Sequence, residues 1–95
     1  MDISFKKSGL KLKEVKFREG EDKNGQAKKY FKCAFVDDAS GDYIELPMGE
    51  QLAEHIKMIE DSSPNYSFTV SVKFSSFYDQ QKNVFGFKPW CFNAE

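Results

Sequence analysis

The sequence has no long hydrophobic run and few of the residues that build catalytic or metal sites. No stretch of its 95 residues approaches the roughly 18 consecutive apolar residues that a membrane-spanning helix needs. Residues 1–13 (MDISFKKSGLKLK) also lack the apolar core and the small-residue cleavage site of a secretory signal. We therefore expect a cytoplasmic protein without a membrane segment.

Histidine and cysteine are scarce, and neither is arranged for chemistry. His55 is the only histidine, and the chain has no nucleophile elbow, no phosphate-binding glycine loop and no Cys–His pair at a recognisable spacing. Cys33 and Cys91 fit neither a zinc knuckle nor a CxxC redox pair, and both lie in apolar runs, so we interpret them as reduced core thiols. The sequence therefore predicts a protein that is not an enzyme and that binds no metal or cofactor.

Charge is segregated along the chain, although the formal net charge is only −1. Residues 1–36 carry ten Lys or Arg against five Asp or Glu, residues 37–61 carry one against eight, and residues 62–95 carry three against two. A chain with charge blocks of this kind can present a basic face in spite of an acidic total. The alternative is that folding mixes the three blocks over the surface.

Alternation of apolar and polar residues predicts five β-strands. The segments with this pattern are residues 10–17, 30–38, 43–46, 66–77 and 84–92. In the first, the alternation slips at Glu14, which predicts a β-bulge. Between the first two, Asn24 and Gly25 form a favoured pair for a type I′ hairpin turn. In the fourth, every second residue from Phe68 to Phe74 is apolar and is expected to face the core.

One segment has the period of a helix instead. Over residues 48–61, apolar residues recur three or four positions apart and form a stripe along one side of a helix. They are Met48, Leu52, Ile56 and Ile59. Three antiparallel strands, a short helix and two further strands follow the order of an OB-fold barrel. The sequence thus predicts one mainly β domain over residues 1–95, an OB-fold-like five-stranded barrel with a short helix between strands 3 and 4; the alternative is a small α+β sandwich.

Basic and aromatic residues occur together around the predicted loops. Proteins that hold single-stranded nucleic acid need cations for the phosphates and flat rings for the bases, and each stacked base contributes about 1–3 kcal/mol. For every ring the alternative is packing in the core, and we assign Trp90 to the core. The candidate nucleic-acid-binding residues are Arg18, Lys23, Lys28, Lys29, Tyr30, Lys32, Tyr43 and Phe85.

Three fragments, in the same order along the chain, resemble one known family. The first is a basic hairpin with a tyrosine (REG…KNG…KKY), the second is FVDDASGDYIEL, and the third is SSF followed by VFG. They are similar to the single-stranded DNA-binding protein of filamentous phages, a small OB-like barrel that works as a dimer. The resemblance implies a DNA-binding wing with Arg18, Lys23 and Tyr30, and a further binding tyrosine at Tyr43. It also implies that Phe85, at a loop tip, stacks on bases of the strand held by the partner subunit.

Charge, rings and resemblance together predict a non-enzymatic, largely sequence-independent single-stranded DNA-binding protein. We expect it to derive from a phage or mobile element, to act in DNA replication or transfer, and to form a homodimer. RNA is a further candidate ligand, because stacking rings accept either nucleic acid. The alternative is a protein-interaction module that docks a partner through an exposed strand edge or through the acidic helix. The acids of that helix are Glu50, Glu54, Glu60 and Asp61.

Overall fold

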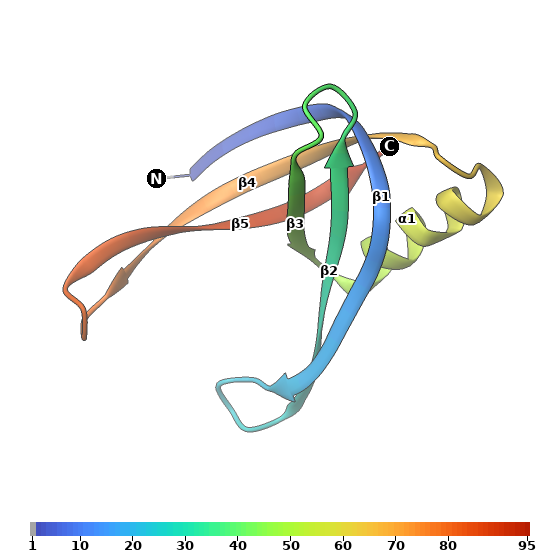
Figure 1. The fold of residues 1–95 in the computed structure, drawn as a ribbon. Helices are drawn as coiled ribbons and strands as arrows, with labels where there is room; N and C mark the ends of the chain where they lie inside the picture. The colour runs from blue at the N-terminus through green and yellow to red at the C-terminus, as the bar shows by residue number, and fades with distance from the viewer. Residues whose placement is uncertain (1) are drawn as a thin grey trace.

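Five antiparallel strands form one sheet, and one helix packs against it (Figure 1). The computed structural model describes residues 2–95. The elements in chain order are β1 (Asp2–Glu21), β2 (Ala27–Asp37), β3 (Tyr43–Met48), α1 (Glu50–Ser62), β4 (Ser67–Asp79) and β5 (Val84–Ala94). This confirms the predicted mainly β class, with five strands and a short helix between strands 3 and 4.

The long first strand joins the two halves of the sheet. Residues 2–11 of β1 pair with β4 and residues 10–21 pair with β2, which gives the strand order β3-β2-β1-β4-β5. The register of β1 shifts at residues 7–10 and again at residues 12–14. The second shift is the predicted β-bulge. The first contains Gly9, whose φ of +75° is a conformation that glycine adopts without steric cost.

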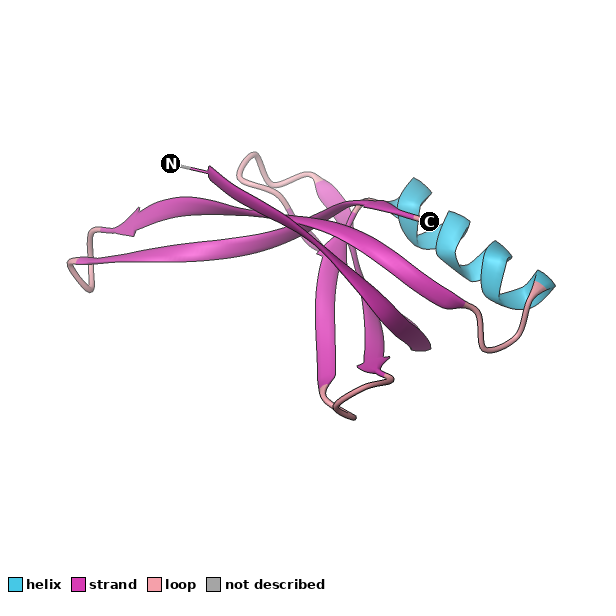
Figure 2. Cartoon of the chain, turned by 90° about the horizontal axis from the view of Figure 1, so that it is seen from above, coloured by secondary structure: helices cyan, strands magenta, loops and turns pink. Residues whose placement is uncertain are grey.

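At these shifts β1 changes partner, from β4 in its first half to β2 in its second half. The strand thus belongs to the β1–β2 hairpin and also pairs beside the β4–β5 hairpin, and we call the two hairpins arms. The β1–β2 arm ends in the loop of residues 22–26, and the β4–β5 arm ends in the loop of residues 80–83. The two arms point in different directions in Figures 1 and 2. Helix α1 lies at the end of the sheet opposite the tip of the β4–β5 arm. The helix therefore covers the body of the sheet and leaves this arm uncovered.

The core lies between the inner face of the sheet and α1. Phe68, Val70 and Val72 of β4 are at most 1% exposed, as their alternation predicts. Cys33 and Cys91 are buried free thiols, which confirms their interpretation as core residues. Burial raises the pKa of Cys33 to about 12, so this thiol stays protonated at neutral pH.

The helix contributes the predicted apolar stripe to this core. Ile56 is fully buried, and Leu52 and Ile59 pack against the same cluster. Met48 is buried too, but as the last residue of β3, because the chain stays extended through Gly49 and the helix begins only after it. Among the described residues, no helix has the length and apolar character to cross a membrane.

The loop at the tip of the β1–β2 arm differs from the prediction. A type I′ turn needs positive φ at both central residues, but of the predicted pair only Gly25 has one, at +76°. The Asp22 carboxylate accepts hydrogen bonds from the backbone N–H groups of Asn24 and Gln26, at 2.8 and 3.0 Å. The type I′ prediction is therefore wrong, because the Asp22 side chain organises a longer loop between the paired residues 21 and 27.

The sheet is not closed into a barrel. Its two edge strands, β3 and β5, lie close together, but no ladder joins them in the part of the chain that the structure describes. Each edge strand contains a proline, Pro47 in β3 and Pro89 in β5, and proline has no N–H to donate to a neighbouring strand. The prolines oppose pairing of the two edges and leave an open gap between them, which we call the seam.

Candidate nucleic-acid interface

The outer face of the β1–β2 arm gathers basic residues from two strands. Strand alternation turns Phe31 toward the core, so its neighbours Tyr30 and Lys32 face outward. The register places Arg18 directly opposite Tyr30, and Lys16 directly opposite Lys32. The predicted wing residues of these two strands therefore share one face.

Tyr30 is fixed on this face by its neighbours. The guanidinium carbon of Arg18 lies 4.4 Å from the ring centroid of Tyr30, and the Nζ of Lys28 lies 5.3 Å from it. The Tyr30 hydroxyl donates a hydrogen bond of 3.2 Å to the backbone carbonyl of Glu21. The ring also lies against Gly20, where an added Cβ would come within 3.1 Å of a ring carbon. Two cations are thus held against a half-buried aromatic ring.

None of the candidate cations makes an ion pair within 4.0 Å with a described residue, although the charge of Lys32 helps to lower the pKa of Glu45 and Glu19 lies opposite Lys29 in the register. Among the described residues, ion pairs within 4.0 Å are made by Lys7, Lys11 and Lys16. The charge of the candidate cations is therefore available to a phosphate. They are Arg18, Lys23, Lys28, Lys29 and Lys32.

Three of these lysines lie toward the tip of the β1–β2 arm. Lys23 is exposed in the loop of residues 22–26. Lys28 and Lys29 line a shallow hollow of about 220 Å³ beside Glu19. Lys28 shares the phase of Tyr30 and, with Lys23, extends the basic surface along the arm, whereas Lys29 lies opposite Glu19 and in the other phase of the strand.

Tyr43 belongs to a neutralised cluster with Lys16 of β1 and Glu45 of β3. The cluster adjoins the basic face, because Lys16 and Glu45 line a hollow of about 260 Å³ together with Arg18, Tyr30 and Lys32. The Nζ of Lys16 lies 2.6 Å from Oε1 of Glu45, and the Tyr43 hydroxyl donates a hydrogen bond of 2.8 Å to the same oxygen. The hydrogen bond between Lys16 and Glu45 raises the pKa of the lysine and lowers the pKa of the carboxyl. Both groups therefore stay charged and offset each other. Tyr43 is 54% exposed, so it offers a ring but no free cation beside it.

A groove leads from the basic face across the seam to β5. A hollow of about 660 Å³ is lined by cations, Tyr30 and Phe31 of the β1–β2 arm, by Pro47 and Met48 of β3, and by Lys88 and Trp90 of β5. Gly49 and one acid, Glu50 at the start of α1, also line it. A second hollow, of about 590 Å³, shares Tyr30, Pro47, Lys88 and Trp90 and continues to Lys73 of β4. Charge from both hairpins thus lines one continuous surface around two aromatic rings.

Trp90 and Lys88 are the groove residues that sequence reasoning missed. The assignment of Trp90 to the core is wrong, because its side chain is 42% exposed and lines the groove. The signal is present in the sequence, since Cys91 is buried and adjacent residues of a strand face opposite sides. Lys88 shares the phase of Trp90, so both face the groove.

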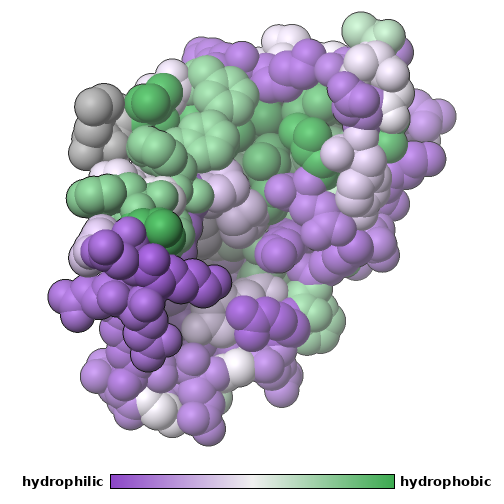
Figure 3. Space-filling model, turned by 60° about the vertical axis from the view of Figure 1, so that its left-hand side comes forward, coloured by the Kyte–Doolittle hydropathy of each residue, from purple (hydrophilic) through white to green (hydrophobic). Residues whose placement is uncertain are grey.

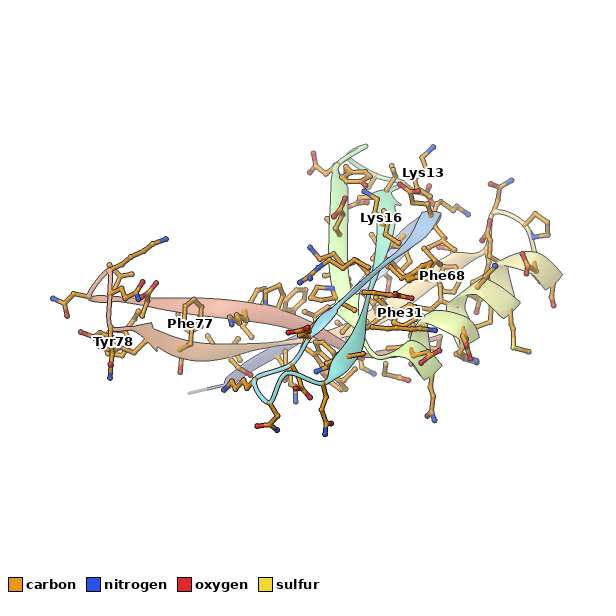
Figure 4. The ribbon with its side chains drawn as sticks, turned by 90° about the horizontal axis from the view of Figure 1, so that it is seen from below. Lys13, Lys16, Phe31, Phe68, Phe77 and Tyr78 are labelled. Carbon is orange, nitrogen blue, oxygen red and sulfur yellow. The ribbon has the colours of Figure 1, made fainter. Side chains whose placement is uncertain are left out.

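Phe85 lies on the other face of the β4–β5 arm. It is in phase with Phe87 and out of phase with Trp90. Its ring is 78% exposed and contacts Tyr78 of β4, with ring centroids 4.9 Å apart. Figure 4 shows Tyr78 at the tip of this arm and Phe31 in the body of the molecule. Within one chain, the structure therefore does not bring Phe85 together with the basic residues.

Apolar side chains also form an uncovered surface on this part of the molecule, which we call the arm face. Its five members come from β4, β5 and the start of β1, and each is between 44% and 78% exposed. They are Ile3, Phe5, Tyr78, Phe85 and Phe87. In Figure 3, apolar side chains (green) gather in the upper part of the view, whereas the β1–β2 arm below is hydrophilic (purple).

Comparisons with protein-family models, with curated proteins and with solved structures give no match for this chain. Within residues 2–95, no group of three or more His, Cys, Asp or Glu side chains is placed to hold a metal ion. The site is therefore interpreted from its own geometry.

Proposed function

We propose that the chain is a non-enzymatic, largely sequence-independent single-stranded DNA-binding protein. It acts in the cytoplasm, in replication or transfer of DNA of a phage or mobile element. The observation that carries the proposal is the groove, in which unpaired cations from two hairpins surround Tyr30 and Trp90. Single-strand binders combine charge and flat rings in this way.

In this mechanism the strand follows the cations and turns its bases toward the rings. Arg18, Lys28 and Lys32 on one side of the groove, and Lys88 on the other, neutralise phosphates. Each neutralised phosphate releases a counterion, so the logarithm of the binding constant falls with the logarithm of salt by about 0.7 per phosphate on a single strand. Stacking accepts any base, which makes the binding largely independent of sequence.

Titration of a labelled oligo-dT by fluorescence anisotropy tests the proposal. We expect binding at low salt, a steep loss of affinity as salt rises, and weaker binding to a duplex of the same length. An oligo-U of equal length measures whether RNA is accepted as well. Absence of binding to both single strands at low salt would contradict the proposed function.

We further propose that the chain forms a homodimer through the arm face, in line with the resemblance to a dimeric family. An aromatic side chain can bury about 150–250 Å², so the four rings, which are roughly half exposed, offer about 400 Å² of apolar contact per copy, and Ile3 adds to it. A standard interface buries about 800 Å² per partner, which the polar rim of the arm completes. A second copy presents the same surface, as a two-fold interface requires.

Sedimentation velocity over a range of protein concentrations tests the dimer. The wild-type chain is expected to sediment as a dimer and Phe87→Asp as a folded monomer, because the substitution places a charge in the apolar contact. The matched control is Phe92→Asp, at an exposed ring of β5 outside the arm face. A monomeric wild-type chain would remove this interface, and with it the route by which Phe85 reaches a strand held by the partner subunit.

The acidic helix supports a second candidate, a module that docks a basic protein partner. Glu50, Glu54 and Asp61 are exposed on α1, and Met58 beside them is 67% exposed. Glu60 takes no part in this surface, because its carboxylate accepts a hydrogen bond from the backbone N–H of Asn65, at 3.1 Å. This candidate predicts that oligonucleotides do not bind and that a basic protein is retained by the wild-type chain but not by Glu54→Lys.

A further inference from the structure

The seam lies where an OB-like barrel would close, and prolines on both edge strands oppose its closure. The edges of β3 and β5 come close without pairing in the described residues. Pro47 and Pro89 lie on the two facing edge strands, and both line the hollow of about 590 Å³. Because each proline lacks a backbone N–H, the two edges cannot form a continuous β-ladder along their whole length. The gap between them is therefore part of the groove.

The hollow at the seam has the size and lining of a ligand site. Its volume of about 660 Å³ falls within the range of about 300–1,000 Å³ that is typical of small-molecule sites. Its rings are Tyr30, Phe31 and Trp90, and Pro47 adds an apolar wall. Arg18 of β1 and Lys88 of β5 are among the cations of its lining, which outnumber its one acid, Glu50. Flat apolar walls with cations beside them suit a planar group attached to a phosphate chain.

The two rings of the seam differ in what already covers them. Tyr30 has Arg18 at 4.4 Å and Lys28 at 5.3 Å from its ring centroid, so cations occupy its surface. Trp90 makes no ring stacking or cation–π contact with any described residue, although its indole is 42% exposed. The indole is therefore the uncovered platform of the groove, and the larger ring stacks more strongly.

We propose that the seam is a base pocket, in which one base of the bound strand turns out of the backbone and stacks on Trp90. Pro47 forms the wall across the seam, and the phosphates flanking this base lie on the cations of β2 and β5, Lys32 and Lys88. The inference rests on the proposed function and names the residue that makes the strand's main base contact. It also gives the physical reason for the weaker binding that we expect of a duplex, since a paired base cannot leave its stack without an energetic cost.

Trp90 is the only tryptophan of the chain, so its fluorescence reports directly on the pocket. We expect oligo-dT to quench this fluorescence with the same midpoint as the anisotropy titration. An abasic strand of the same length keeps every phosphate but has no bases. It is expected to bind at least about 5-fold more weakly, because the loss of a single stacked base at 1–3 kcal/mol already weakens binding about 5- to 150-fold. It is also expected to leave the fluorescence unchanged.

Substitution tests the same contact independently. Trp90→Ala should lower the affinity for oligo-dT by a factor in the same range, Trp90→Phe should restore part of it, and Phe92→Ala should leave it unchanged. Circular dichroism identifies a variant that does not fold; in that case the wild-type fluorescence and the abasic strand decide. If oligo-dT binds without quenching and the abasic strand binds equally well, the base pocket is refuted and the proposed function stands. If neither oligo-dT nor the abasic strand binds, the base pocket and the proposed DNA-binding function are both refuted.

Discussion

The β1–β2 arm and the β4–β5 arm follow the same strand alternation but present opposite surfaces. The first is covered on its inner side by the core and α1, except at Phe17, which stacks on Phe31 and is 62% exposed. Its outer side carries cations that make no ion pair within 4.0 Å among the described residues. The second extends past the helix, and its inner-phase rings have no cover within the chain (Figure 2). Neither surface is needed to complete the core. The two proposals use this difference, since DNA binding is assigned to the charged surface and dimer contact to the apolar one.

The largest expected effect lies in the core that both arms share. Phe68 is fully buried and packs edge-on against Phe35, with centroids 5.9 Å apart. Phe68→Ala should lower the free energy of unfolding by about 3–5 kcal/mol, because a cavity replaces the ring. Urea denaturation measures this, with Phe85→Ala as the control at an exposed ring, where the change should stay within about 0.5 kcal/mol. A large loss for Phe85→Ala would mean that the tip of the β4–β5 arm is structural.

The next largest effect concerns the salt dependence of DNA binding, which we expect to depend on the cations of the β1–β2 arm. Lys32→Ala removes one unpaired cation of the groove and is expected to reduce the slope of log affinity against log salt by about 0.7–1. Lys57→Ala removes an exposed lysine of α1 and should leave the slope unchanged. Anisotropy titrations at four salt concentrations measure both slopes. Equal slopes for the two variants would mean that the strand does not follow the β1–β2 arm.

A smaller effect tests how the β4–β5 arm is packed. A Cβ added at Gly86 would lie 2.5 Å from Cζ of Phe77, so the ring must move to make room. Gly86→Ala should therefore destabilise the protein by about 1 kcal/mol. Phe77→Ala removes the obstacle, so the double variant should be less destabilised than the sum of the two single changes. Additive effects in urea denaturation would show that the ring and the glycine do not meet in solution.

The smallest effect is a pH dependence at the end of β2. Lys7 lies 2.7 Å from the Asp37 carboxylate, and this hydrogen bond, followed by one from the backbone N–H of Ala39, lowers the pKa of Asp37 below its ordinary value of 3.8. A lowered folded-state pKa gives stability that is present above 3.8 and is lost as the pH falls toward the folded value. The melting temperature of Asp37→Asn should therefore be slightly lower than that of the wild type at neutral pH, and the two should converge in acid. A constant difference across this range would contradict the assignment.

Local pattern predicted the fold well, because strand and helix periods are set by neighbours in sequence. The bulge at Glu14, the inward residues of β4 and the stripe of α1 all follow from such periods. The first strand was predicted over residues 10–17 but spans residues 2–21, because its first half is stabilised by pairing with β4, which is distant in sequence. The open seam could not be predicted from local pattern either, because it depends on the curvature of the whole sheet.

The candidate site was predictable only in part, for the same reason. The outward phase of Tyr30 and Lys32 follows from the apolar residues between and around them, and the structure has both on the groove. Trp90 of the edge strand β5 and Tyr30 of β2 line the same hollow although the two strands are far apart in sequence, and no local pattern encodes that arrangement. Phe85 was predicted to lie with the basic residues, but its position beside an exposed loop does not determine which face of the hairpin it occupies. That face follows only from the register of β4 and β5.

Because β3 and β5 are the two ends of one continuous sheet, the bend of its middle strand sets how far apart those ends stand. Both register shifts of β1, at residues 7–10 and 12–14, lie in that strand, and neither contributes a side chain to the hollow at the seam. We therefore expect Gly9→Ala, which places a side chain at a φ of +75°, to change the width of that hollow without contacting it. If the proposed base pocket is selected to fit the thickness of a base, the selection acts on residues 7–14 of β1 as well as on the residues that line the pocket.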